Sequence, residues 1–159
     1  MSDSINGGLL DDVVRFLAGN ARALDSADYD KWIDDFVDDC RYVVESTENI
    51  ALGYDMPVIY ARNKDMLHDR ILSLRQANLY NIHRDRHILG LPFLTQEAAS
   101  LSVETSFAVY QTNQDGYSEL FCVGMYRDQL VRKESAYKIQ SRLVIVDSFA
   151  IKRLLATPL

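Results

Sequence analysis

The chain has 159 residues, of which 48% are hydrophobic and 25% charged, a composition typical of one soluble globular domain spanning residues 1–159. Its formal net charge of −6 and its pI near 5.0 disfavour an electrostatic interaction with nucleic acid or an anionic membrane. No apolar run approaches the roughly 18 residues of a membrane span. The acidic, polar start MSDSINGG does not resemble a secretion or transit signal, and the two cysteines are widely spaced, so we expect a cytoplasmic protein.

Apolar residues at helical spacing predict helices in the first half of the chain. One apolar stripe runs through residues 9–24, and a second runs from about residue 27 to 37. The segment CRYVVE, residues 40–45, has the composition of a strand, and a polar loop is expected after it. Asn63 is suited to cap a third helix that extends to about Leu74.

From His83 onwards the period of the apolar residues changes from helical to two. Residues 101–110 alternate apolar with polar side chains, and a turn signal at 113–116 leads to a second long strand over about 117–131. A third strand is predicted over 137–147. This order predicts an α+β fold with helices packed in the concave face of a strongly curved, mostly antiparallel sheet. Closed around its helices, such a sheet forms a cone whose interior is either a small-molecule pocket or a filled core.

All three histidines lie in one stretch, HDRILSLRQANLYNIHRDRHILGLP. His83 and His87 would share a face in a helix, but in a strand they lie about 13 Å apart, which is too far for one metal ion. The alternation of charges from Arg84 to His87 instead indicates a charged strand edge that pairs within the subunit or across an interface. Proton transfer by a histidine stays open as an alternative.

The acidic run DDFVDD also fails to indicate a metal site. Its carboxylates at Asp34, Asp35, Asp38 and Asp39 lack the glycine and the ligand spacing of a calcium loop, so we interpret them as a solvated helix end. The glycines form no phosphate-binding loop, and no Gly-x-Ser-x-Gly elbow is present. Taken alone, the residues support no catalytic centre.

Five segments carry a resemblance to a known family. They are YDKWIDDFVDDCRY (29–42), LHDRILSLR with the preceding Asp65 (67–75), RDRHILG (84–90), VGMYRDQLVR (123–132) and SRLVIVDS (141–148). In this order they resemble motifs of the small (β) subunit of the aromatic-ring-hydroxylating dioxygenases, the Rieske non-haem iron oxygenases. Ile82 and His83 replace a small residue and a proline that often precede Arg-x-Arg-His, and GLP replaces a frequent downstream asparagine. These departures resemble the branch that acts on carboxylated, hydroxylated or aminated benzoates, such as terephthalate, salicylate and anthranilate.

The resemblance implies the cone-shaped fold of nuclear transport factor 2 and scytalone dehydratase. It also implies a structural role beside a larger α subunit, in an assembly of three α and three β chains. In that family the α subunit carries the Rieske cluster and the mononuclear iron, so we expect no cofactor, metal or catalytic residue here. The ligand count agrees, since the two centres together require four histidines and this chain has three.

The charged stretch is then interpreted as architecture. We expect Trp32, Arg84, Asp85, Arg86 and His87 to form a structural or interface network near a subunit boundary. Because a curved sheet of long strands leaves surface to be covered, we also expect the chain to form a trimer by itself.

Two other classes of function stay open. The first is a free-standing dehydratase, isomerase or cyclase on the same cone, with an acid–base set inside the cavity. Its candidate residues are Tyr29, Asp39, Tyr42, His87 and Tyr110. The second is a cone that serves only as a protein-interaction module. The sequence does not specify which aromatic substrate is hydroxylated, or whether the product is a diol or a monohydroxylated ring.

Overall fold

The computed structural model describes residues 7–76, 82–147, 155 and 157–159, which form four helices and seven strands. The helices are α1 (Gly7–Asp25), α2 (Tyr29–Asp34), α3 (Thr47–Leu52) and α4 (Lys64–Gln76). The strands are β1 (Phe36–Ser46), β2 (Ile59–Ala61), β3 (His83–Leu89), β4 (Phe93–Gln96), β5 (Leu101–Asn113), β6 (Ser118–Lys133) and β7 (Ala136–Val146). The polar start of the chain, the segment ahead of Ile82 and the last residue of SRLVIVDS, discussed above, lie outside the described residues.

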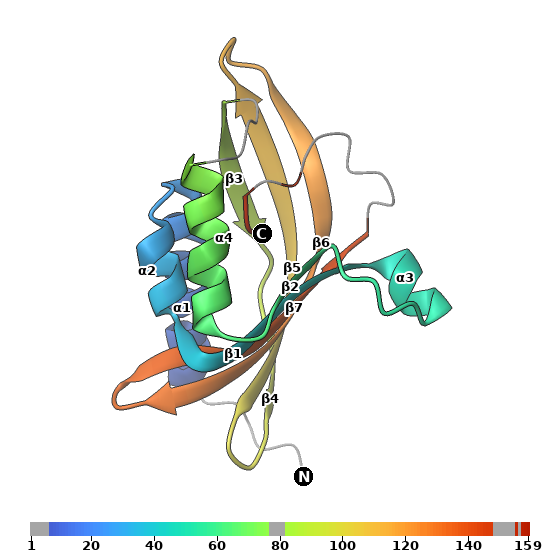
Figure 1. Cartoon of the computed structure of the whole chain (residues 1–159). Coiled ribbons are helices and arrows are strands. Elements are labelled where there is room, and N and C mark those ends of the chain that lie inside the picture. The colour runs from blue at the N-terminus through green and yellow to red at the C-terminus, as the bar shows by residue number, and fades with distance from the viewer. Residues whose placement is uncertain (1–6, 77–81, 148–154, 156) are drawn as a thin grey trace.

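The strands form one curved sheet in the order β2-β1-β7-β6-β5-β3, and β4 pairs with the start of β5. Neighbouring strands are antiparallel except for β1 and β7, which are parallel. Helices α1, α2 and α4 cover the concave face, whereas α3 extends from the opposite side of the sheet (Figure 1). The predicted α+β fold is confirmed. The expectation of a closed sheet was wrong, because β2 at one edge does not pair with β3 or β4 at the other.

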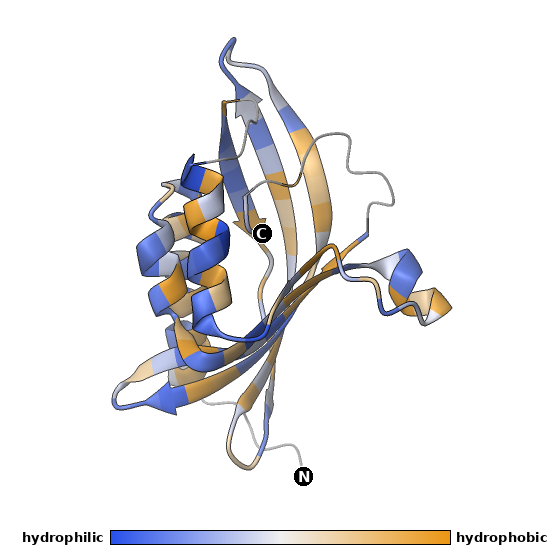
Figure 2. Cartoon of the chain, in the orientation of Figure 1, coloured by the Kyte–Doolittle hydropathy of each residue, from blue (hydrophilic) through white to orange (hydrophobic). Residues whose placement is uncertain are grey.

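The long strands have the alternating pattern that predicted them. Figure 2 shows bands of hydrophobic and hydrophilic residues along these strands. In β5 the side chains of Leu101, Val103, Phe107 and Val109 are buried, and the residues between them are more exposed, apart from buried Thr105 on the same face. Because successive side chains of a strand point to opposite faces, one face of β5 lies against the core and the other faces outward.

The second predicted helix was too long. Helix α2 ends at Asp34, and Phe36 begins β1, where it pairs with Ile139 of the parallel strand β7. Trp32 and Phe36 both face the core, with ring centroids 5.0 Å apart, so their spacing of four residues imitated a continuing helix. The register then shifts between Phe36 and Arg41, a bulge that bends the start of β1.

The acidic run DDFVDD is divided between the end of α2 and the start of β1. Asp34 and Asp35 end α2, as predicted, but Asp38 and Asp39 are exposed residues of β1 rather than part of a helix end. Asp35 is partly buried and accepts a hydrogen bond from the side chain of Asn20 at 2.9 Å. Burial is the main reason that the pKa of Asp35 is raised above its usual value. The polar loop expected after β1 contains α3 and the short strand β2.

Candidate functional site

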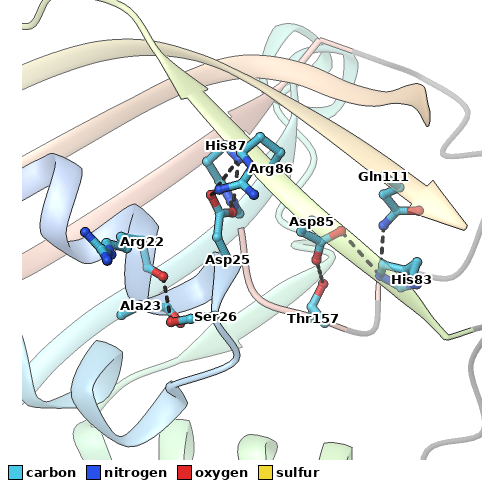
Figure 3. Close-up of polar contacts among 10 residues, drawn as sticks. All are labelled: Arg22, Ala23, Asp25, Ser26, His83, Asp85, Arg86, His87, Gln111 and Thr157. Carbon is cyan, nitrogen blue, oxygen red and sulfur yellow. Dashed lines mark hydrogen bonds and ion pairs between the residues drawn. The ribbon is translucent and has the colours of Figure 1, made fainter. Parts of the chain in front are cut away.

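The candidate network begins with a buried pair that joins α1 to β3. Asp25, the last residue of α1, lies with one carboxylate oxygen 2.7 Å from His87 Nδ1 and 3.0 Å from the backbone nitrogen of His87 (Figure 3). An ionised carboxylate only accepts hydrogen bonds, so His87 Nδ1 carries the proton and donates it. The histidine side chain is 1% exposed. Asp25 therefore fixes both the backbone and the ring orientation of His87.

Arg86 forms a second, solvent-exposed ion pair with Asp25. Its Nη1 lies 3.7 Å from the second carboxylate oxygen of Asp25, but its side chain is 70% exposed. Water and salt screen such a pair, so Arg86 adds little to the stability of the subunit. Its guanidinium is free to reach a group on another chain. Arg84, two residues earlier on the same face of β3, is also exposed.

A second polar group lies further along β3, where Asp85 meets His83 and Thr157. The Thr157 hydroxyl donates to Asp85 Oδ2 at 3.0 Å, and His83 Nε2 lies 3.3 Å from Asp85 Oδ1 (Figure 3). The same nitrogen of His83 lies 3.2 Å from Gln111 Nε2 on β5. His83 Nε2 accepts from the Gln111 amide when it carries no hydrogen, and it donates to the Asp85 carboxylate when it carries one. Asp85 thus ties β3 to residues at the far end of the chain.

Trp32, the other predicted member of the network, lies elsewhere. Its side chain is completely buried and contacts Phe36 and Tyr42 edge-on, with centroids 5.0 and 5.4 Å away. The structure therefore places Arg84, Asp85, Arg86 and His87 on one strand, β3, and Trp32 in the hydrophobic core.

A third polar cluster was not predicted as a site. Arg142 on β7 forms a bidentate pair with Asp128 on β6, at 2.8 and 2.9 Å, and donates to the side-chain oxygen of Asn20 at 2.7 Å. Both charged side chains are at most 2% exposed. Burial lowers the pKa of Arg142, but attraction to Asp128 outweighs that effect and the pKa is raised. The cluster joins α1 to the middle of the sheet.

The two charged residues of this cluster lie in segments that the sequence had already singled out. Asp128 lies in VGMYRDQLVR and Arg142 in SRLVIVDS, two of the segments that carried the family resemblance. Their pairing follows from the antiparallel register, in which Asp128 is opposite Arg142. Opposite charges on facing strands are the pattern that would have indicated the pair.

The acid–base set of the alternative enzyme is not assembled. Asp39 is exposed on β1, and Tyr110 is 42% exposed, on the opposite side of the sheet from the helices. Tyr42 is buried, but its hydroxyl is occupied, since it donates to the carbonyl oxygen of Leu159 and accepts from its backbone nitrogen, both at 3.0 Å. Burial raises the pKa of Tyr42 to about 12, which keeps it neutral.

The interior of the cone is filled around Tyr42 and beside Tyr126. The gap between α1 and the sheet beside Tyr126 and Arg142 is too narrow for a water-sized molecule. A more open groove of about 560 Å³ lies between α1 and β3, and Asp25, Arg86 and His87 are among its lining residues. Over the described residues, no group of three or more His, Cys, Asp or Glu side chains is arranged to hold a metal ion. Among the same residues, no helix is long and apolar enough to cross a membrane.

Two groups of exposed side chains on the described part of the chain are candidate contact surfaces. The first, which we call the arm, runs from the start of α3 to Tyr60 in β2; it exposes Ile50, Leu52, Tyr54, Met56, Val58 and Tyr60. The second lies on the outer face of the sheet, where Arg86, Tyr110 and Leu120 occupy neighbouring positions on β3, β5 and β6. Large exposed apolar patches commonly mark contacts with other chains.

Relatives with the same overall architecture are found among solved structures. A protein from Novosphingobium aromaticivorans described as the β subunit of an aromatic-ring-hydroxylating dioxygenase superposes with a TM-score of 0.88 and 34% identity, covering 98% of this chain and all of that one. A protein from the same organism described as a scytalone dehydratase gives a TM-score of 0.70 at 13% identity, covering 93% and 90% of the two chains. The second likeness concerns the fold alone, and it confirms the predicted scytalone dehydratase-like architecture.

Sequence relatives indicate the family. The β1 subunit of the terminal oxygenase component of terephthalate 1,2-dioxygenase from Comamonas sp is 36% identical over 148 residues, which cover 92% of this chain and 96% of that protein. The small subunit of anthranilate 1,2-dioxygenase from Burkholderia cepacia is 34% identical, covering 86% and 85%. Both names belong to the branch that the sequence resembled. A family model described as the ring hydroxylating beta subunit matches residues 19–153. This chain therefore belongs to the β-subunit family of the ring-hydroxylating dioxygenases.

Proposed function

We propose that this chain is a non-catalytic β subunit that supports the assembly of a multicomponent aromatic-ring-hydroxylating dioxygenase. The partner is a larger α subunit, which by family resemblance carries the Rieske cluster and the mononuclear iron. The two cysteines, Cys40 and Cys122, are buried free thiols, which fits a reducing cytoplasm. Burial raises the pKa of these thiols to about 11 and about 12, so they stay protonated and unreactive.

The observation that carries the structural role is the filled core around Tyr42. Residues 157–159 and the aromatic side chains of Trp32, Phe36 and Tyr42 occupy the space between the helices and the sheet. A catalytic pocket needs a cavity with convergent polar groups. Here the hydroxyl of Tyr42 and the carboxylate of Asp85 are already bonded within the chain.

The polar network of β3 supports a role in assembly. Inside the sheet, Asp25 and His87 fix the position of the strand relative to α1. Outside it, Arg84 and Arg86 present guanidinium groups that suit bidentate pairing with a carboxylate of a neighbouring chain. The buried half of the network would thus hold the exposed half in a defined orientation.

The substrate is proposed from the relatives. Terephthalate and anthranilate, which appear in the names of two relatives, are both aromatic carboxylic acids. We infer that the full complex hydroxylates a ring of this class. The α subunit would select the substrate, because the reacting iron lies in that chain.

Co-expression with a large subunit of a ring-hydroxylating dioxygenase tests the proposal. We expect a single complex of three α and three β chains by light scattering, with iron in proportion to the α subunit, and turnover of one or more aromatic carboxylates. The β chain purified alone should form a trimer, bind no stoichiometric iron and turn over no substrate. A β chain that stays monomeric beside its partner, or that dehydrates or isomerises a substrate unaided, would overturn the proposal.

A further inference from the structure

Residues 157–159 lie inside the concave side of the molecule, between α4 and the sheet (Figure 1). Leu159 is 1% exposed and belongs to the same core cluster as Trp32 and Tyr42. Its backbone nitrogen and carbonyl both bond the Tyr42 hydroxyl. Thr157 is 7% exposed, and its hydroxyl donates to Asp85 Oδ2. These contacts combine one buried apolar group with a few directed polar bonds, which is the pattern of a bound small ligand.

The surrounding residues leave polar atoms without hydrogen bonds. Among the residues that the structure describes, Trp32 Nε1 and His87 Nε2 are buried without a hydrogen-bond partner, and Asp85 Oδ1 has only the contact with His83. Trp32 contacts Tyr42 directly, and Asp85 and His87 are alternate residues on the inner face of β3. Native proteins bond most of their buried polar groups, so the unsatisfied atoms of Asp85, which Thr157 contacts, and of Trp32, which packs on Tyr42, call for an explanation.

We propose that residues 157–159 occupy a latent ligand site of the cone and block it. Without them, the site would accept a small neutral molecule with an aromatic ring and a hydroxyl group. The ring would take the place of the Leu159 side chain in the core cluster that also contains Trp32 and Tyr42, and the hydroxyl would take the place of the Thr157 hydroxyl on Asp85. This inference deepens the proposed function, on which it rests, because it gives a physical reason for the absence of catalysis by this chain.

The test releases the segment in the full-length chain and measures binding of 2-naphthol. Leu159→Asp places a carboxylate in the apolar core, which strongly favours departure of the segment because burying an unpaired charge is costly. Leu159→Ala only weakens the anchor. Trp32 is the single tryptophan of the chain, so quenching of its emission reports occupancy of the site directly. Leu91→Asp, at a position 76% exposed, introduces the same charge outside the core and is the matched control.

We expect Leu159→Asp to bind 2-naphthol roughly tenfold or more tightly than the parent chain, because the segment no longer competes for the site. Leu159→Ala should be intermediate, and Leu91→Asp should equal the parent. Equal affinity in a folded Leu159→Asp variant and the parent would overturn the inference. If Leu159→Asp does not fold, Leu159→Ala decides, and an affinity no higher than that of the parent overturns the inference. Co-purification of each variant with the large subunit is measured separately, so failure of probe binding in a chain that still assembles leaves the proposed function intact.

Discussion

At the residue scale, Asp128 and Arg142 show why a buried ion pair is tolerated in this core. Removing two charges from water is costly, and their attraction compensates only when the remaining donors are also bonded. Arg142 meets that condition, because Asp128 accepts two of its hydrogen bonds, Asn20 accepts a third, and the guanidinium lies 4.5 Å from the ring centre of Tyr126. The pair thus fixes how α1, β6 and β7 fit together.

Breaking this pair should be strongly destabilising. Asp128→Asn leaves the Arg142 charge buried without its counter-charge, and we expect the free energy of unfolding to fall by about 3–5 kcal/mol in urea denaturation. Glu104→Gln is the control, since it removes an ion pair with Arg127 whose side chains are 45% and 53% exposed. It should change stability by less than about 1 kcal/mol. Similar losses for both variants would show that burial does not determine the effect.

His87 and Arg86 should separate stability from assembly. His87→Phe removes the ring donor of buried Asp25, and we expect a loss of about 1–3 kcal/mol in the free energy of unfolding of the isolated chain. Arg86→Ala should reduce it by less than about 1 kcal/mol, because Arg86 is exposed and Asp25 keeps its bonds to His87. Arg86→Ala should instead weaken co-purification with the large subunit. Normal assembly of Arg86→Ala would remove Arg86 from the proposed interface.

At the element scale, β6 depends on a glycine where the sheet bends. A Cβ atom at Gly124 would overlap the carbonyl oxygen of Ile145 on β7 and lie 3.1 Å from the ring of Phe107 on β5. The backbone of β7 cannot move away without breaking the ladder. Gly124 therefore allows the close approach of three strands.

Two glycine substitutions should have opposite effects. Gly124→Ala should destabilise the chain by about 1–3 kcal/mol, because the added methyl group overpacks the sheet. Gly19→Ala is the control in α1, where an added Cβ meets nothing within 4 Å. It should stabilise the chain by roughly 0.5–1 kcal/mol through helix propensity. Thermal unfolding measures both changes, and a Gly124→Ala variant as stable as the parent would contradict the steric argument.

Local sequence patterns predicted the elements whose partners lie nearby, and missed those defined by distant contacts. The alternation in β5, β6 and β7 was sufficient, because each strand pairs with the next along the chain. Phe36 was assigned to a helix because its pairing with Ile139 depends on a strand a hundred residues later. The bond between Asp25 and His87 spans 62 residues, and the bond between Tyr42 and Leu159 spans 117. Neither leaves a local pattern, although the motif RDRHILG identified the correct strand.

At the scale of the whole molecule, the arm stands out because exposed apolar side chains follow one another along it. The arm carries six exposed apolar side chains and lies on the opposite side of the sheet from α1, α2 and α4 (Figure 1). Helix α3 has no buried residue of its own, so the core does not hold its apolar side chains. A short helix with this composition is expected to be covered by another chain.

Charge substitutions in the arm should therefore disrupt assembly while preserving the fold. Leu52 and Met56 are 57% and 71% exposed, so a glutamate at either position stays in water in the isolated subunit. Leu52→Glu and Met56→Glu should leave the thermal unfolding of the monomeric chain unchanged within about 0.5 kcal/mol. At an interface the same carboxylate is desolvated and unpaired, so association should weaken by tenfold or more, roughly 1.4 kcal/mol or above.

Light scattering across a concentration series measures this association, first for the chain alone and then with the large subunit. Tyr117→Glu serves as the control, since Tyr117 is 76% exposed beside the β5–β6 turn, away from the arm. Loss of the β trimer alone would assign the arm to contacts between β chains. Loss of the mixed complex with an intact β trimer would assign it to the α subunit. If both assemblies survive both arm substitutions, the arm is not a subunit interface, and the outer face that contains Arg86, Tyr110 and Leu120 becomes the surface to test.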